Sequence, residues 1–348
     1  VSPAYTVLRN LGFFDTNYAR YLLKANPYVQ ALDASSQGIR KGKTITYDAF
    51  GGVSLPVPPL ELQRRIALFL DVETQRIDEL VQEQERQSQL SHEKLDAEID
   101  ALVTTGLTQQ SDLKSTGLSW PRLIPSHWKL ARAKNAVRSI KGGVWGTEPA
   151  GDESDIPCVR VADFDRLRGE VGLVVPTIRS VSSSERTGRI LQKGDLVLER
   201  SGGGDNQPVG SMALYVGDGP AVCSNFTSRV QLHPGMNPSY WRFVHWSLYR
   251  QRVNTKSIKQ TSGIQNLDAE QYLSELVPFP PEAEQSAIGQ EAEEILRNAL
   301  VLARETDTCM RLLLERRSAL ITAAVTGQID VSTWQPPSDW AGREANLP

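Results

Sequence analysis

One stretch of the chain constrains the fold more than any other, the residues from Pro281 to Asp330. Prolines at 278, 280 and 281 disfavour a helix before it, while Pro281 itself suits the first turn of a helix. Gly289 is then the only glycine before Gly327, and no proline interrupts the segment. A helix of this length would span roughly 65 to 70 Å. Its predicted coiled-coil seam steps by four and three through Ile288, Ala292, Ile295, Ala299, Leu302, Thr306, Cys309, Leu313, Arg316 and Leu320.

The same stretch occurs twice in the sequence. The prolines and the polar start of the second copy match the first copy at an offset of 222 positions, Pro278 against Pro56. Upstream of the prolines, segment 240–243 (YWRF) matches segment 18–21 (YARY) at the same offset. Self-similarity at a long, constant spacing indicates repeated structural units. One unit is therefore an α/β module, a proline-marked connector and a long helix.

This repeat predicts the domain organisation. Because Val1 aligns with Cys223 at the same offset, we expect the front half of the first module to be missing. We predict a strand over 5–11, a helix around 17–24, strands within 156–164, 190–204, 209–219 and 228–234, a helix over 237–251 and a polar loop over 254–266. The predicted segments are an incomplete first module (1–57), a first long helix (58–106), a polar linker (107–119), a complete second module (120–277), a second long helix (278–330) and a loosely ordered polar tail (331–348).

Charge is distributed unevenly along the chain. The formal net charge is only −3. Residues 129–262, however, hold 19 Lys and Arg against 12 Asp and Glu, a net charge of +7. The long helices are acidic, with 5 basic against 11 acidic residues over 60–105 and 5 against 9 over 281–330. A basic module mounted on acidic helices favours binding of a polyanion such as nucleic acid, although ordinary solvated faces are the alternative.

The cysteines and the hydropathy bear on the compartment. Cys158, Cys223 and Cys309 are odd in number and far apart, which indicates a reducing cytoplasm and argues against a disulfide framework or a zinc site. No apolar run approaches the roughly 18 residues of a membrane span. We therefore expect a cytoplasmic protein with no membrane association.

A search for catalytic machinery finds little. The glycines at 202–204 are not followed by the Lys-Ser/Thr of a phosphate-binding loop. Asp195 and Glu199 lie four residues apart, but Asp195 follows Lys193 and Gly194 and fits a turn better than a metal site. The four histidines show no ligand spacing. The sequence thus predicts no catalytic residue, no metal and no cofactor.

Residues suited to nucleic-acid binding are concentrated in the second module. Lys and Arg neutralise phosphates, while Arg, Asn and Gln can form bidentate pairs with base edges. Any one of them is more commonly a solvated surface residue, so only their concentration in a basic module supports the prediction. The candidate DNA contacts are Lys141, Arg160, Arg200, Ser201, Asn225, Arg229, Lys256, Lys259, Gln260 and Ser262.

Several motifs resemble the specificity (S) subunits of type I restriction-modification systems. They are the PxPPxxEQ pattern at 278–285, LLLERRSALITAAVTGQID at 312–330, IPSHW at 124–128, LQKGDLVLERSG at 191–202 and TSGIQNL at 261–267. The resemblance implies an α/β protein whose target-recognition domains are separated by two long helices, packed as an antiparallel coiled coil. It further implies a non-catalytic subunit that reads a bipartite site in double-stranded DNA and docks methyltransferase (modification) subunits. These in turn recruit the translocating restriction subunit.

Two other functions are compatible with the sequence. The chain could be the DNA-recognition half of a single-chain restriction enzyme fused to a methyltransferase. It could also be a structural coiled-coil adaptor with incidental α/β modules. Genomic sequence upstream would distinguish the first alternative, and neutralising Lys256 and Lys259 would distinguish the second, because an adaptor should be unaffected.

Overall fold

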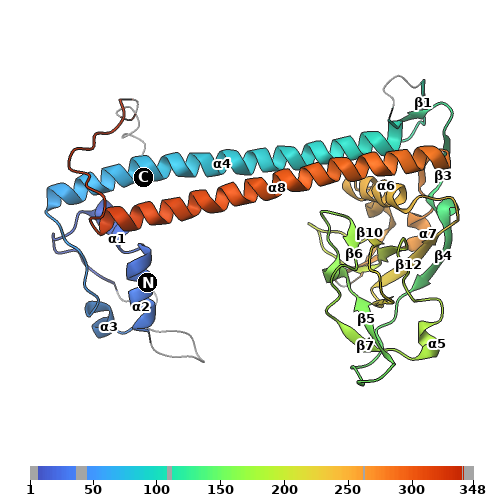
Figure 1. The fold of residues 1–348 in the computed structure, drawn as a ribbon, viewed down its shortest axis with the longest axis horizontal. Coiled ribbons are helices and arrows are strands. Elements are labelled where there is room, and N and C mark those ends of the chain that lie inside the picture. The colour runs from blue at the N-terminus through green and yellow to red at the C-terminus, as the bar shows by residue number, and fades with distance from the viewer. Residues whose placement is uncertain (1–6, 37–44, 108–111, 262, 339, 341–348) are drawn as a thin grey trace. The chain divides into compact units, whose positions relative to one another are not determined.

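The computed structural model describes residues 7–36, 45–107, 112–261, 263–338 and 340. The chain divides into two compact units. Unit 1 comprises Val1–Leu90 and Leu302–Pro348, and unit 2 comprises Ser91–Val301. The long helices α4 (Leu60–Thr105) and α8 (Glu282–Val325) each contribute one part to each unit (Figure 1).

The predicted long helices are confirmed with nearly the expected ends. Glu282 and Glu284 lie in the first turn of α8, where the positive end of the helix dipole stabilises carboxylates. Gly106 follows the last residue of α4 and has a φ of +78°, a backbone conformation that glycine adopts readily.

In each unit α4 and α8 pack antiparallel. The start of α4 and the end of α8 share a core in unit 1, which includes Leu70 and Val325. The end of α4 and the start of α8 share the main core of unit 2, which includes Ile99 and Leu296.

The predicted α8 seam is correct at Ala299, Thr306 and Leu313, which are buried or half-buried, but wrong at the positions that alternate with them. Leu302, Cys309 and Arg316 are exposed, whereas the next residue in each case is partly buried. The inward positions run from Ile288 to Ala324 in ten steps that together cover 36 residues. The average step is therefore 3.6 residues, the period of an undistorted α-helix, rather than the 3.5 residues of a heptad coiled coil. These positions are 288, 292, 296, 299, 303, 306, 310, 313, 317, 321 and 324.

Unit 1 adds three short helices to the helix pair, α1 (Thr16–Leu22), α2 (Asn26–Ala34) and α3 (Tyr47–Gly51). The strand predicted over 5–11 is not found over residues 7–11, where Val7 is 76% exposed, and residues 5 and 6 lie outside the described part. The tail is better packed than predicted between Val331 and Trp334. Val331 is buried, and Trp334 packs edge-on against Phe69, with ring centroids 5.3 Å apart.

Unit 2 is a mixed α/β module built around a five-stranded sheet in the order β4-β12-β8-β10-β6. Pairs β4–β12, β12–β8 and β8–β10 are antiparallel, and β10–β6 is parallel. The strands are β4 (Val137–Gly142), β12 (Thr227–Leu232), β8 (Leu196–Glu199), β10 (Met212–Tyr215) and β6 (Glu170–Val171).

Smaller sheets flank the five-stranded sheet. One has the order β11-β5-β7 and another β13-β14-β9, while β1 pairs with β2 and β15 pairs with β3. Strand β1 lies within the segment predicted as a linker, so that prediction is wrong there. The strands are β1 (Leu113–Ser115), β2 (Leu123–Pro125), β3 (Lys129–Arg132), β5 (Asp155–Val159), β7 (Ile178–Ser180), β9 (Ser201–Gly202), β11 (Val222–Cys223), β13 (Ile258–Thr261), β14 (Ile264–Leu267) and β15 (Leu276–Phe279).

The predicted helix over 237–251 is α6 (Pro238–Arg250). The side chain of Asn237 caps it by accepting a hydrogen bond from the Tyr240 N–H at 3.0 Å. Buried residues of α6 share one core with strands β8 and β10 and with both long helices, so α6 lies between the sheet and the helix pair. Five shorter helices complete the described part of unit 2. They are the 3-10 helices η1 (Ala133–Ala136), η2 (Val161–Asp163) and η3 (Val253–Ser257) and the α-helices α5 (Ser183–Arg186) and α7 (Ala269–Tyr272).

The internal repeat reappears as repeated contacts. In unit 2 the Tyr240 hydroxyl lies 3.1 Å from the carbonyl oxygen of Pro278 and 3.4 Å from that of Val103. In unit 1 the equivalent tyrosine makes the same two contacts at the same distances. These equivalents are Tyr18, Pro56 and Val325, each displaced by 222 positions.

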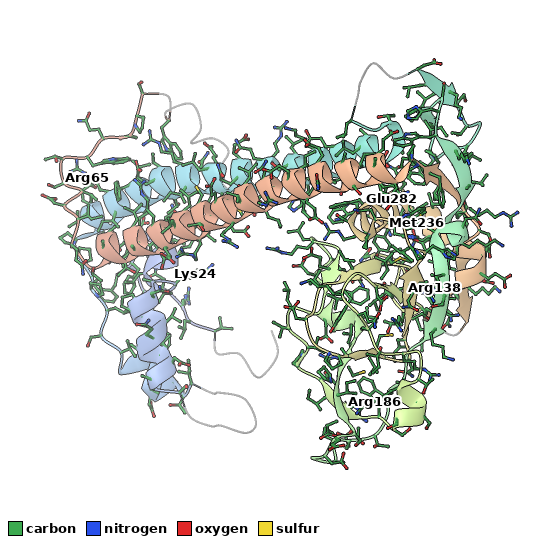
Figure 2. The ribbon with its side chains drawn as sticks, turned by 45° about the vertical axis from the view of Figure 1, so that its right-hand side comes forward. Lys24, Arg65, Arg138, Arg186, Met236 and Glu282 are labelled. Carbon is green, nitrogen blue, oxygen red and sulfur yellow. The ribbon has the colours of Figure 1, made fainter. Side chains whose placement is uncertain are left out.

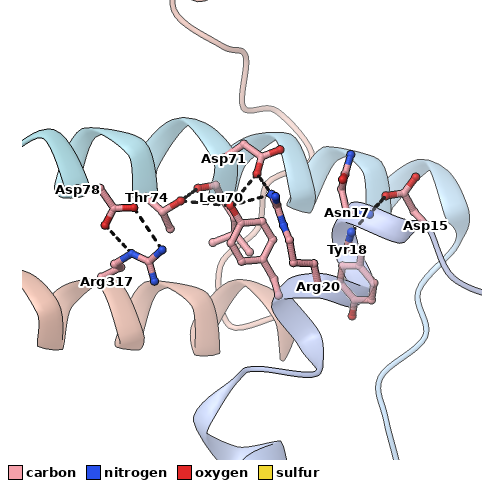
Figure 3. Close-up of polar contacts among 10 residues, drawn as sticks. Asp15, Asn17, Tyr18, Arg20, Leu70, Asp71, Thr74, Asp78 and Arg317 are labelled. Atoms are coloured by element: carbon pink, nitrogen blue, oxygen red, sulfur yellow. Dashed lines mark hydrogen bonds and ion pairs between the residues drawn. The ribbon is translucent and has the colours of Figure 1, made fainter. Parts of the chain in front are cut away.

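An ion pair is repeated in the same way. Arg20 contacts Asp71 on α4 at 2.5 Å (Figure 3), and Arg242 contacts Glu293 on α8 at 2.5 Å. Arg242 is fully buried and also contacts Glu170 on β6, whereas the Arg20 side chain is 44% exposed. Both modules are therefore attached to the long helices by one common set of contacts.

Candidate nucleic-acid interface

Sequence-distant candidate residues meet where strand β8 ends. The backbone of Arg200 is held on both sides, its N–H donating to Phe226 O and its carbonyl accepting from Leu267 N, each at 2.8 Å. Ser201 Oγ donates to Asn266 Oδ1 at 2.5 Å, which ties β9 to β14. Asn225 is exposed beside Phe226. The structure therefore brings Arg200, Ser201 and Asn225 together.

The segment predicted as a polar loop, 254–266, is instead η3 followed by the hairpin β13–β14. Lys259 and Gln260 are exposed on β13, and Lys256 is exposed just before it. Lys259 Nζ donates to Asp268 at 2.7 Å, and this hydrogen bond lowers the pKa of the Asp268 carboxyl. Ser262, also predicted as a contact, lies outside the described residues.

A groove of about 630 Å³ adjoins this cluster. Three basic residues line it, Lys134, Arg138 and Arg200, together with the acidic residues Asp268 and Glu270. Figure 2 shows Arg138 on β4, which is an edge strand of the five-stranded sheet. We call the exposed or half-exposed cations around this groove and the neighbouring hairpin the basic face. Its members are Lys134, Arg138, Lys141, Arg200, Lys256 and Lys259.

Three members of this site were not predicted. Lys134 and Arg138 are exposed on and before β4, and Phe226 is 50% exposed beside Arg200. Residues 138–142 of β4 are all exposed, so the strand lacks the alternation of buried and exposed positions that would have assigned its basic residues to one face. An exposed large aromatic residue next to basic residues is typical of binding surfaces, and this signal was available at Phe226.

Two predicted contacts occupy other environments. Arg229 lies on β12, is 7% exposed, and donates from Nε to Asp195 at 2.7 Å. This placement gives Arg229 a structural role within the sheet, and we leave it out of the basic face. Arg160 precedes η2 and pairs with Asp163 at 2.9 Å, three residues along the same chain segment.

The carboxylates considered for catalysis are structural. Asp195 stands in the turn before β8, as predicted, and accepts from Gln192 N at 2.7 Å as well as from Arg229. Glu199 is 1% exposed and faces Arg166 at 3.2 Å, and burial raises the pKa of the Glu199 carboxyl. Across the described residues, no group of three or more His, Cys, Asp or Glu side chains is arranged to hold a metal ion.

Known proteins were compared with the chain and its fold. No protein-family model matches the sequence. The Type I restriction enzyme EcoKI specificity subunit of Escherichia coli (strain K12) is 21% identical over 329 residues, covering 93% of this chain and 68% of that protein. A chain in a structure of the assembly and conformational transition of the type I R-M system matches with a TM-score of 0.68. That match has 17% identity and covers 93% of this chain and 74% of the other.

The chain is thus similar in sequence to a type I specificity subunit and shares the fold of a chain from a type I R-M system. The match in sequence over 93% of the chain and the shared fold agree with the motifs in the long helices and the second module. No helix of the described part is both long and apolar enough to cross a membrane.

Proposed function

We propose that the chain is a type I specificity subunit, that it recognises double-stranded DNA through the basic face of unit 2, and that it is itself non-catalytic. The observation that carries the proposal is the convergence of Lys134, Arg138 and Arg200 on one groove, next to the exposed lysines of the β13 hairpin. Positively charged side chains on one face of a domain supply the electrostatic part of DNA binding, while groove side chains supply specificity.

We further propose how the rest of the chain serves this recognition. Residues 120–277 form the target-recognition domain, and the long helices α4 and α8 dock the methyltransferase (modification) subunits. The restriction subunit joins through that assembly, which places the chain with DNA in the cytoplasm. The similarity to a named specificity subunit over 93% of the chain supports these assignments.

A salt titration of DNA binding tests the proposal. Each phosphate contact contributes a slope of about −0.9 to log Kobs against log salt concentration for duplex DNA. Contacts from the six residues of the basic face therefore predict a slope of about −5 for the full chain. A binding constant that stays flat between low and high salt would contradict the proposal.

A double lysine variant separates this function from that of a structural adaptor. Lys256→Ala with Lys259→Ala should make the slope shallower by about 2 and weaken binding to any DNA sequence. The loss of Lys259 also leaves the Asp268 carboxylate unpaired near the phosphates. Lys193→Ala is the matched control, because Lys193 is an exposed lysine of unit 2 that pairs with Asp218 at 2.8 Å away from the basic face. Equal binding by the double variant and the control would favour the adaptor.

A further inference from the structure

The cations of the groove differ in how firmly they are held. Lys134 and Arg138 are exposed side chains, and among the described residues no hydrogen bond or ion pair restrains their charged groups. Arg200 is half-buried, and both its N–H and its carbonyl are bonded to neighbouring strands or loops. The backbone of Arg200 is therefore fixed.

The guanidinium of Arg200 is nevertheless uncommitted. Among the described residues it forms no hydrogen bond or ion pair, unlike Arg166 and Arg229, which are paired with carboxylates of the same unit. A positioned guanidinium with all its donors free is suited to bidentate recognition, because its planar fork needs two acceptors at a set spacing.

Two carboxylates in the groove disfavour a phosphate as that acceptor. Asp268 and Glu270 line the same groove as Arg200, and the hydrogen bond from Lys259 holds the pKa of the Asp268 carboxyl low, so this carboxyl is ionised at neutral pH. Carboxylates repel phosphate but accept hydrogen bonds from base amino groups such as cytosine N4. The exposed ring of Phe226 next to Arg200 adds an apolar surface for a thymine methyl group.

We propose that Arg200 is a specificity-determining residue that reads the major-groove edge of a guanine. Lys134 and Arg138 hold the flanking phosphates. This assignment deepens the proposed function and rests on it. Arg is the residue that pairs bidentately with guanine O6 and N7, and losing such a pair relaxes preference at one position, whereas losing a phosphate contact weakens binding to all sequences.

The test begins with selection of preferred sites from a random duplex library by the full chain. Arg200→Lys keeps the charge but removes the fork. It should bind random DNA within about 3-fold of the wild type, lose about 10- to 100-fold on the selected site, and lose its preference for guanine at one position. Lys134→Ala and Arg138→Ala are the controls, and each should weaken selected and random DNA by equal factors.

The outcomes separate this inference from the proposed function. If the wild type binds and selects a sequence, but Arg200→Lys selects the same sequence with the same preference, the role of Arg200 is overturned and DNA recognition stands. If the wild type binds no DNA, both are overturned. Arg200→Ala, checked for folding by circular dichroism, gives a second readout, and an unchanged preference in that variant would equally contradict the inference.

Discussion

The two units attach their modules to the long helices by the same contacts, but the residues that make these contacts are buried to different extents. Tyr18 and Tyr240 bond equivalent carbonyls at equal distances, and Arg20 and Arg242 pair with equivalent carboxylates on α4 and α8. In unit 2 a strand of the sheet covers Arg242 with a second carboxylate, and the arginine is fully buried. In unit 1 the arginine is 44% exposed.

Unit 2 also has an attachment that is not found among the described residues of unit 1. Four tryptophan indole N–H groups of the module donate hydrogen bonds to side chains on the long helices. Trp120 donates to Asp100 at 2.7 Å, Trp246 to Asp96 at 3.0 Å, Trp128 to Glu284 at 2.8 Å and Trp241 to Gln285 at 3.1 Å. The positions equivalent to Trp241 and Trp246 in unit 1 are Ala19 and Lys24. The comparison indicates that the tyrosine and arginine contacts set the position of a module, while the indole contacts hold the complete, sheet-bearing module in place.

The largest expected effect on stability is that of replacing Arg242, the repeated arginine of unit 2, and Arg20 is its counterpart in unit 1. Arg242→Ala leaves Glu293 and Glu170 facing each other without their cation, which should lower the free energy of unfolding by about 3 to 5 kcal/mol. Arg20→Ala removes an exposed pair and should cost about 1 kcal/mol or less. Hydrogen exchange followed by mass spectrometry reads the two units separately, and equal losses would break the comparison.

A pH dependence linked to a buried histidine is expected in unit 2. Burial lowers the pKa of His245 to about 3, whereas its equivalent in unit 1 is Leu23. Below the ordinary pKa of about 6.5 the unfolded state binds a proton that the folded state does not. The stability from neutral His245 is therefore fully present above pH 6.5 and is lost as the pH falls toward 3, by up to about 1.4 kcal/mol per pH unit.

Two histidine variants check this pH dependence. His245→Gln should flatten the dependence of unit 2 stability on pH between 6.5 and 4, measured by urea unfolding with tryptophan fluorescence. His233→Gln changes an exposed histidine of the same unit and should leave the slope as it is. A slope that persists in His245→Gln would assign the acid sensitivity to other groups.

The smallest effect concerns a repeat-equivalent pair on the long helices, Asp96 and Ser318. Asp96 accepts a hydrogen bond from the Trp246 indole and forms an ion pair with Arg250, so Asp96→Ala should cost about 1 to 2 kcal/mol. Among the described residues, Ser318 Oγ makes one exposed hydrogen bond, which it accepts from Asn26 at 2.8 Å, so Ser318→Ala should change stability by less than about 0.5 kcal/mol. A cost at Ser318 as large as at Asp96 would show that the indole contacts add nothing.

Much of the fold could be predicted from the sequence because it rests on local patterns. Prolines and glycines bracket both long helices, and the Asn237 cap with Pro238 marks the start of α6. The hairpin over 258–267 could not be predicted because, at the start of its second strand, the apolar residue is exposed and the polar residue that follows it is buried. Gln265 points inward and lies within 3.2 Å of Val209 N, while Ile264 is 54% exposed.

The site could be predicted only in part, for a related reason. Exposed cations such as Lys256 and Lys259 were identified from composition, which carries information about surface charge. Arg229 looked the same in the sequence, but its carboxylate partner Asp195 lies 34 positions away and is brought beside it by the pairing of β8 with β12. Long-range partners of this kind decide which arginines remain free, as Arg200 does.

The most direct measurement for the central claim is methylome sequencing of a host that expresses the complete operon with and without this chain. The account predicts one methylated DNA sequence that appears only when the chain is present, and that changes or relaxes when Arg200 is replaced by lysine. An identical methylation pattern in the presence and absence of the chain would contradict it.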